Sequence, residues 1–118
     1  MIMIDYKDTR PIYEQITHRF EQLILRGVLK TDEQMPSVRT LAMELSINPN
    51  TIQRGYTELE RRGFIYSVKG RGNFVAYSDQ LLDEKRTELS IKLRGILKEA
   101  NELGISKADL MADISEVF

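Results

Sequence analysis

The chain has 118 residues, 42% hydrophobic and 30% charged, with a formal net charge of −1, a balance that indicates a folded globular protein and excludes a disordered one. No apolar run approaches the roughly 20 residues that a membrane-spanning helix needs, and the short apolar start lacks the basic head of a secretory signal. Because the sequence has no cysteine, disulfides and thiolate metal sites are excluded, and we expect a cytoplasmic protein without a membrane partner.

The first predicted helix begins at Pro11 and ends at Gly27. Proline suits a first helical turn because its missing N–H would be unpaired there, and glycine commonly follows the last turn. Apolar residues recur between these limits at three- and four-residue spacing, which predicts one buried face. These residues are Ile12, Ile16, Phe20, Leu23 and Ile24. Residues 28–36 are predicted to form a loop.

Two helices joined by a tight turn are predicted next, over about residues 38–45 and 49–62. Ser37 is the expected cap of the first helix, and Asn48 the expected cap of the second. Pro49 cannot continue the preceding helix but can start the next one, so the turn falls directly before it. The second helix would bury Ile52, Tyr56 and Leu59.

The residue pattern changes to that of β-structure after Gly63. Residues 64–68 and 73–77 are rich in aromatic and β-branched side chains, which predicts two strands. Between them lies the sequence Lys69-Gly70-Arg71-Gly72, which predicts a hairpin turn with two basic side chains.

Helical spacing returns after residue 77 and predicts a long helix over about residues 79–103. A shorter helix should follow, starting with a capping box at Ser106 and Asp109. The long helix carries an apolar stripe on one side, formed by Leu82, Leu89, Leu93, Ile96, Leu97 and Ala100. A small domain cannot hide so long a stripe alone, so we expect a second copy to cover it; folding back as core is the alternative. The predicted domains are therefore residues 1–77 and a dimerisation region, residues 78–118.

The order of these elements predicts a mainly α fold with a small β-hairpin, namely a winged helix-turn-helix with a two-helix tail. Its second short helix can enter the major groove of DNA, where Asn and Gln pair with adenine and Arg with guanine. The backbone amides of Asn50 and Thr51 at the start of that helix would suit a phosphate. Residues 1–78 carry 11 basic and 9 acidic side chains, and residues 79–118 carry 6 and 9, so we expect the tail to avoid DNA.

Four separated blocks of the sequence, residues 11–16, 36–42, 48–60 and 70–75, resemble the GntR family of regulators. The two-helix tail resembles the YtrA-like subfamily. The resemblance implies a homodimeric repressor on a palindromic double-stranded DNA operator, without a cofactor. It implies DNA contacts by Ser37, Arg39, Asn50, Thr51, Gln53, Arg54, Lys69, Gly70 and Arg71. Whether a small-molecule effector acts, and where, stays open.

Several residues have alternative interpretations. Arg61 and Arg62 fit a solvated last helical turn better than base reading, and His18 has no second histidine or cysteine with which to bind a metal. Gly55 costs about 1 kcal/mol relative to alanine in mid-helix, and either close packing or close approach to DNA would explain it. Asp32 stands where the family commonly has glycine, and aspartate tolerates unusual turns.

The sequence has two alternatives to DNA reading, a protein-interaction module and an enzyme. A winged helix can serve as a protein-interaction module without reading a DNA sequence, and a weak dependence on salt would indicate that use. An enzyme is not expected, because the sequence has no cysteine, second histidine, phosphate-binding loop or plausible catalytic triad.

Overall fold

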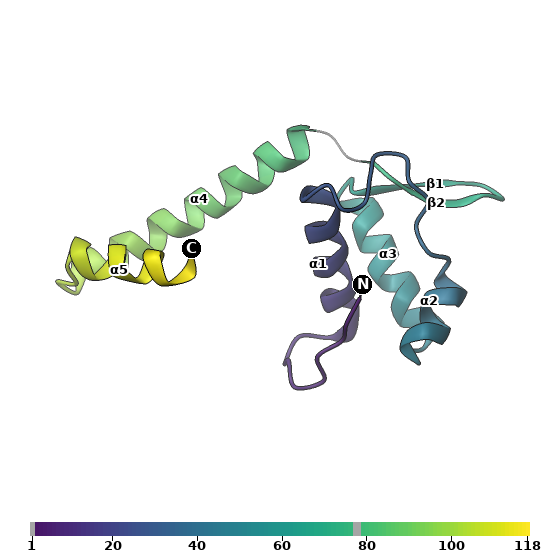
Figure 1. Ribbon diagram of the computed structural model, residues 1–118, viewed down its shortest axis with the longest axis horizontal. Coiled ribbons are helices and arrows are strands. Elements are labelled where there is room, and N and C mark those ends of the chain that lie inside the picture. Colours follow the sequence, from purple (N-terminus) through teal and green to yellow (C-terminus); the bar gives the residue numbers. More distant parts are fainter. Residues whose placement is uncertain (1, 77–78) are drawn as a thin grey trace. The chain divides into compact units, whose positions relative to one another are not determined.

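The computed structural model describes residues 2–76 and 79–118, and the chain divides into two compact units, Met1–Leu82 and Asp83–Phe118. The elements in chain order are α1 (Ile12–Leu25), α2 (Val38–Leu45), α3 (Pro49–Arg61), β1 (Ile65–Val68), β2 (Gly72–Val75), α4 (Asp79–Glu102) and α5 (Lys107–Val117) (Figure 1). This order confirms the predicted mainly helical fold with one β-hairpin. The second strand ends at Val75 and not at the predicted residue 77; Tyr77 lies outside the described residues.

Three of the helices, α2, α3 and α5, begin where short polar side chains cap them. The Ser37 hydroxyl accepts a hydrogen bond from the Thr40 amide at 3.0 Å, and Asn48 Oδ1 accepts one from the Asn50 amide at 2.8 Å. Ser106 caps α5 in the same way, through the amide of Asp109 at 3.1 Å. These side chains satisfy amides that have no partner inside the helix, which confirms the three predicted starts.

The core of the N-terminal unit forms where α1 and α2 pack on α3 (Figure 1). Phe20 and Tyr56 are fully buried and meet edge to face, with ring centroids 5.6 Å apart. Tyr56 is thus a core residue, as predicted. α1 and α3 approach each other closely at Gly55, where an added Cβ would lie 3.1 Å from Cγ2 of Ile16. Packing between helices therefore explains this glycine.

Residues 32–35, which precede α2, lie along the β-hairpin and form backbone hydrogen bonds with β2, although the sequence predicted only a loop there. The Met35 amide donates to the Asn73 carbonyl at 2.8 Å, and the Val75 amide donates to the Glu33 carbonyl at 2.9 Å. Asp32 adopts the left-handed conformation with φ of 65°, and its carboxylate accepts a hydrogen bond from the Tyr66 hydroxyl at 2.8 Å. Aspartate therefore serves at a turn that glycine would also suit.

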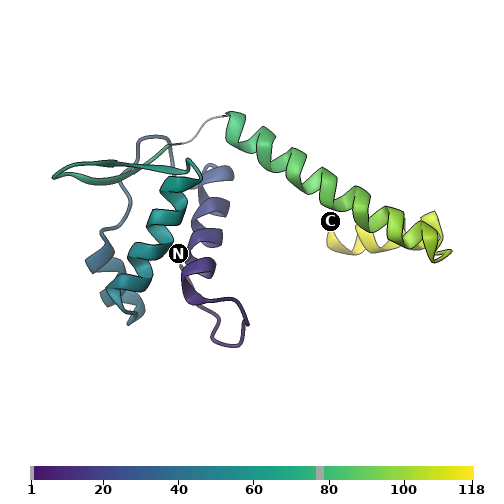
Figure 2. The same cartoon turned by 180° about the vertical axis from the view of Figure 1, so that it is seen from behind.

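In the C-terminal unit, α5 folds back along α4 to form a helical hairpin, called here the tail hairpin (Figure 2). Gly104 makes the turn with φ of 75°, and the Ile105 amide donates to the Ala100 carbonyl at 3.0 Å. Ala100 is buried inside this hairpin. The other members of the predicted stripe are each more than a third exposed in one copy of the chain: Leu82, Leu89, Leu93, Ile96 and Leu97.

Candidate nucleic-acid interface

Two of the predicted DNA-contacting residues, Ser37 and Arg39, lie at the start of α2. They differ in their contacts within the chain. The Ser37 hydroxyl donates to Thr40 Oγ1 at 2.8 Å and accepts from the Thr40 amide, so it holds the helix start. Arg39 is the second residue of α2, is exposed, and has no hydrogen bond or ion pair with another described side chain. Its guanidinium group is therefore available to an external anion.

The start of α3 is less free to bind a phosphate than the sequence suggested. The Asn50 amide donates to Asn48 Oδ1, and the Thr51 amide donates to the Asn48 carbonyl at 3.0 Å. Both amides thus have partners inside the turn, with which a phosphate would have to compete, and the expectation that they hold a phosphate stays a prediction. The side chains at this end of α3 stay available, since Asn50 and Gln53 are exposed and Thr51 is half-buried.

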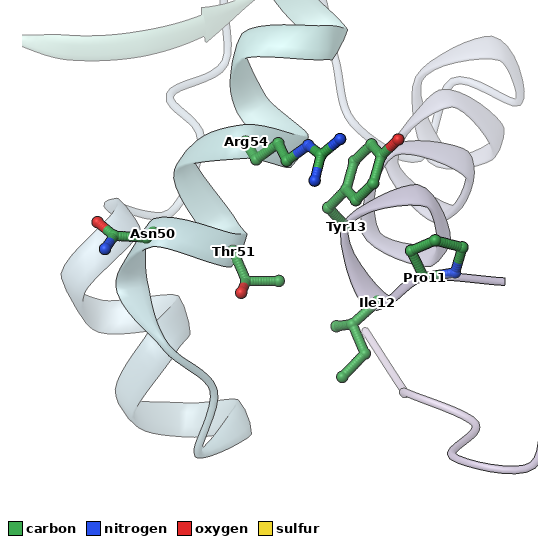
Figure 3. Close-up of a pocket in the computed structure, with 6 residues that line it drawn as sticks. All are labelled: Pro11, Ile12, Tyr13, Asn50, Thr51 and Arg54. Carbon is green, nitrogen blue, oxygen red and sulfur yellow. The ribbon is translucent and has the colours of Figure 1, made fainter.

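A pocket of about 460 Å³ lies between the first turn of α1 and the start of α3 (Figure 3). Its lining consists of Pro11, Ile12, Tyr13, Asn50, Thr51 and Arg54. Within it, the Arg54 guanidinium carbon lies 3.8 Å from the centroid of the Tyr13 ring, which is a cation–π arrangement. The Tyr13 hydroxyl donates to Glu14 Oε1 at 3.2 Å. In the unbound protein, the Arg54 side chain therefore extends from α3 toward α1.

No role for Tyr13 follows from the sequence alone, because nothing local connects it with Arg54. The two residues are 41 positions apart and meet only once α1 packs on α3. The only sign in the sequence is a tyrosine two residues after the helix-starting proline, and its partner cannot be identified without the packing.

The turn of the hairpin, which we call the wing tip, presents Lys69, Gly70 and Arg71 to solvent. Gly70 has φ of 77°, and the Arg71 amide donates to the Val68 carbonyl at 2.9 Å, which closes the turn. Gln34 donates from Nε2 to the Arg71 carbonyl at 2.9 Å. Sequence reasoning missed Gln34, which fixes the wing tip from the neighbouring loop.

The arginines at the other end of α3 are neutralised within the protein. Hydrogen bonds from Arg61, and then from Arg62, lower the pKa of the Glu58 carboxyl to about 2. Arg62 also lies 2.6 Å from the carboxylate of Glu21, whose side chain is only 5% exposed. This pairing agrees with the interpretation that Arg61 and Arg62 are not base-reading residues.

Residues 2–76 and 79–118 show neither a metal-binding cluster nor a membrane-spanning helix. In these ranges no group of three or more acidic or histidine side chains could hold a metal ion. No helix in the same ranges is long and apolar enough to span a membrane.

Comparison with known proteins gives the chain a clear set of relatives. Residues 12–75 match the family described as bacterial regulatory proteins, gntR family. The HTH-type transcriptional repressor YtrA of Bacillus subtilis (strain 168) is 36% identical over 119 residues, which cover 99% of this chain and 92% of that protein. A GntR family transcriptional regulator from Listeria monocytogenes superposes with a TM-score of 0.77 at 34% identity, covering 98% and 100% of the two chains.

One solved structure with the same fold contains DNA. It is described as AraR(DBD) in complex with operator ORX1. It is 25% identical to this chain and superposes with a TM-score of 0.57, covering 64% of this chain and 95% of that one. The shared region is thus a fold that a solved relative uses on an operator.

Proposed function

Because this chain belongs to the GntR family of DNA-binding transcription regulators, we propose that it is a cytoplasmic repressor that binds a palindromic operator as a homodimer. The proposal rests first on the unpaired cations around the helix-turn-helix. Among the described residues neither Arg39 nor Arg54 has a carboxylate partner, and Arg54 stacks on the ring of Tyr13, whereas Arg61 and Arg62 are neutralised internally. The name of the similar Bacillus subtilis protein supports repression.

The proposed reading surface consists of side chains from three elements of the N-terminal unit. Arg39 would come from α2, Asn50, Gln53 and Arg54 from α3, and the basic side chains from the wing tip. Asn and Gln can pair with adenine, and Arg can pair with guanine or a phosphate, so the set can read bases and hold the backbone. Ser37 and Gly70 would shape this surface by capping α2 and forming the wing turn, and Thr51 would contribute from the pocket between α1 and α3.

The tail supports a dimer because its exposed apolar residues have no cover in one copy. Leu89, Leu93 and Ile96 are 51%, 48% and 60% exposed along one side of α4. Burying such aliphatic side chains stabilises an assembly by roughly 25 cal/mol per Å² of apolar surface. A two-fold dimer would also match the symmetry of a palindromic site. Ala100 would support this seam from inside the tail hairpin.

The decisive experiment selects bound sequences from a random pool of duplex DNA with the full-length protein. Recovery of a palindrome with two equal half-sites is the expected result, and an unenriched pool would contradict sequence-specific reading. Affinity for the selected site should fall steeply between 50 and 200 mM salt, through counterion release. Binding that ignores salt would favour the protein-interaction module instead.

Variants then test the residues. Arg39→Ala and Arg54→Ala should each weaken binding to the selected site about tenfold or more, since a good arginine contact contributes about 1–3 kcal/mol. Arg26→Ala is the matched control, because Arg26 is also exposed but lies at the end of α1. Equal affinities for all three variants and the unaltered protein would remove the proposed reading surface.

A further inference from the structure

The contact between Arg54 and Tyr13 joins the proposed reading helix to a different helix. The guanidinium carbon lies over the ring of Tyr13 at 3.8 Å from its centroid, and both side chains line the pocket between α1 and α3 (Figure 3). Tyr13 is half-buried, and Arg54 is exposed. The arginine is therefore held at one end by its own helix and at the other by an aromatic face that the core keeps in place.

The packing beside this contact fixes the two helices relative to each other. Gly55, the residue after Arg54, lets α3 approach α1 closely, and its carbonyl accepts a hydrogen bond from Thr17 Oγ1 at 3.2 Å. The same hydroxyl lies 2.8 Å from the carbonyl of Tyr13. The Thr17 hydroxyl thus contacts the carbonyl of Tyr13 and that of Gly55, the residue after Arg54. These contacts hold α1 against α3 at the pair, so the ring and the arginine cannot easily separate.

The stacked geometry leaves the hydrogen-bonding edge of Arg54 unused. A guanidinium group has five N–H donors in its plane, and stacking covers its face and not its edge. No described residue accepts a hydrogen bond from Arg54. The edge is therefore free for a pair of acceptors on DNA, such as O6 and N7 of guanine or two oxygens of a phosphate.

We infer that Tyr13 is a positioning residue for DNA reading, which holds the Arg54 guanidinium in one orientation before DNA arrives. An exposed arginine loses rotamer entropy when it is ordered, and a pre-ordered one loses less on binding. The ring also fixes the plane of the guanidinium, so only an acceptor pair in that plane can be met. This inference rests on the proposed function, because it requires that Arg54 contacts DNA.

A double-mutant cycle on the full-length protein tests the inference. Tyr13→Phe keeps the aromatic face and removes only the hydroxyl, whereas Tyr13→Leu keeps apolar bulk and removes the aromatic face. Each change is made alone and together with Arg54→Ala, and the Kd for the selected operator is measured at one salt concentration. Thermal unfolding of every variant is measured in parallel.

The expected pattern separates positioning from stability. Tyr13→Phe should bind like the unaltered protein, and Tyr13→Leu should bind about three- to tenfold more weakly, the range of a partly desolvated cation–π contact. In the Arg54→Ala background, Tyr13→Leu should have no further effect on Kd. The selection is also repeated with Tyr13→Leu. Its base preference or affinity should differ from that of the unaltered protein only at the operator positions at which Arg54→Ala also differs.

Two results would overturn the inference while leaving the proposed function intact. One is unchanged affinity of Tyr13→Leu when Arg54→Ala is weakened; the other is an equal loss from Tyr13→Leu with and without Arg54. If Tyr13→Leu lowers the melting temperature strongly, Tyr13→Met repeats the test with a more adaptable side chain. Failure of the unaltered protein to prefer any DNA sequence would instead overturn the proposed function, and this inference with it.

Discussion

The hydroxyl of Tyr56 in α3 donates a 2.8 Å hydrogen bond to the carbonyl of Pro36, the residue before the cap of α2. The bond joins the two helices of the helix-turn-helix through the core, because the Tyr56 ring is only 1% exposed. Burial, and to a lesser extent the charge of Glu44, raises the pKa of the Tyr56 hydroxyl. The hydroxyl therefore stays protonated and remains a donor at neutral pH.

Tyr56→Phe should lower the free energy of unfolding by about 1–2 kcal/mol, since it leaves the Pro36 carbonyl without its partner and keeps the ring packing. Urea unfolding of the full-length protein measures the change. Tyr66→Phe is the matched control, because the Tyr66 hydroxyl also makes a 2.8 Å bond, but from an exposed ring. An equal loss for both variants would show that burial of the Tyr56 bond does not matter.

Gly55→Ala should destabilise the N-terminal unit by about 1 kcal/mol. Overpacking costs about 1–3 kcal/mol, and the better helix propensity of alanine returns about 1 kcal/mol of it. Gly95→Ala in α4 is the control, since an added Cβ there meets nothing within 4 Å and should raise the melting temperature or leave it unchanged. If Gly55→Ala is the more stabilising of the two, the close approach of α1 and α3 is not a constraint.

Arg62→Ala and Arg39→Ala should separate folding from binding. The first leaves the buried carboxylate of Glu21 without the partner that lies at 2.6 Å, so the free energy of unfolding should fall by about 1–3 kcal/mol with little change in operator affinity. The second removes an exposed, unpaired side chain, so stability should change by less than about 0.5 kcal/mol while affinity falls. Urea unfolding and operator titration of the same preparations would expose a reversal of this pattern.

Glu58 should contribute an acid-sensitive part of the stability. Its folded-state pKa is lowered to about 2, mainly by hydrogen bonds from Arg61 and Arg62, whereas an unfolded glutamate titrates near about 4.3. Its contribution is therefore complete above about pH 4.3 and is lost as the pH falls toward 2. Glu58→Gln should be less stable than the unaltered protein at pH 7, and the gap should close between about pH 4.3 and 2. Glu44→Gln, which removes an exposed carboxylate without a described ion pair, should show no such convergence.

Leu93→Asp should convert the proposed dimer to a monomer, because it places a charge in the apolar stripe of α4. Ile91→Asp is the matched control: Ile91 is 64% exposed, and two positions along a helix correspond to nearly the opposite side. Sedimentation at tens of micromolar, about the range in which weak dimers form, should give half the mass for Leu93→Asp only. A dimer in both variants would place the contact elsewhere, and a monomeric unaltered protein would remove the proposed seam.

The features that the sequence predicted well depend on residues close together in the chain. The caps at Ser37, Asn48 and Ser106 each act over two or three positions, so they are visible without the fold. The same holds for the periodicity that separates helices from strands. Where a helix has both a cap and an apolar stripe, its predicted limits fall within about two residues of the observed ones, the usual uncertainty of helix ends.

The features that the sequence could not predict depend on contacts between distant segments. The edge that residues 32–35 add to the hairpin uses backbone hydrogen bonds, which leave no side-chain pattern to recognise. Tyr13 acquires a role only because α3 places Arg54 over its ring. Ala100 belonged to the apolar stripe by spacing alone, and the fold-back of α5 decides that it is buried within one chain.

The loop over residues 32–35 has a mechanical consequence for how the protein meets DNA. It is bonded to β2 along its length, holds the wing tip through Gln34, and leads directly into the capped start of α2. These hydrogen bonds couple the wing to the helix-turn-helix, so we expect the two to move as one body. Such a body cannot follow a groove of the wrong width by bending the wing alone. On the proposed function, the duplex would have to adapt instead, and its stiffness would then contribute to which sites this protein prefers.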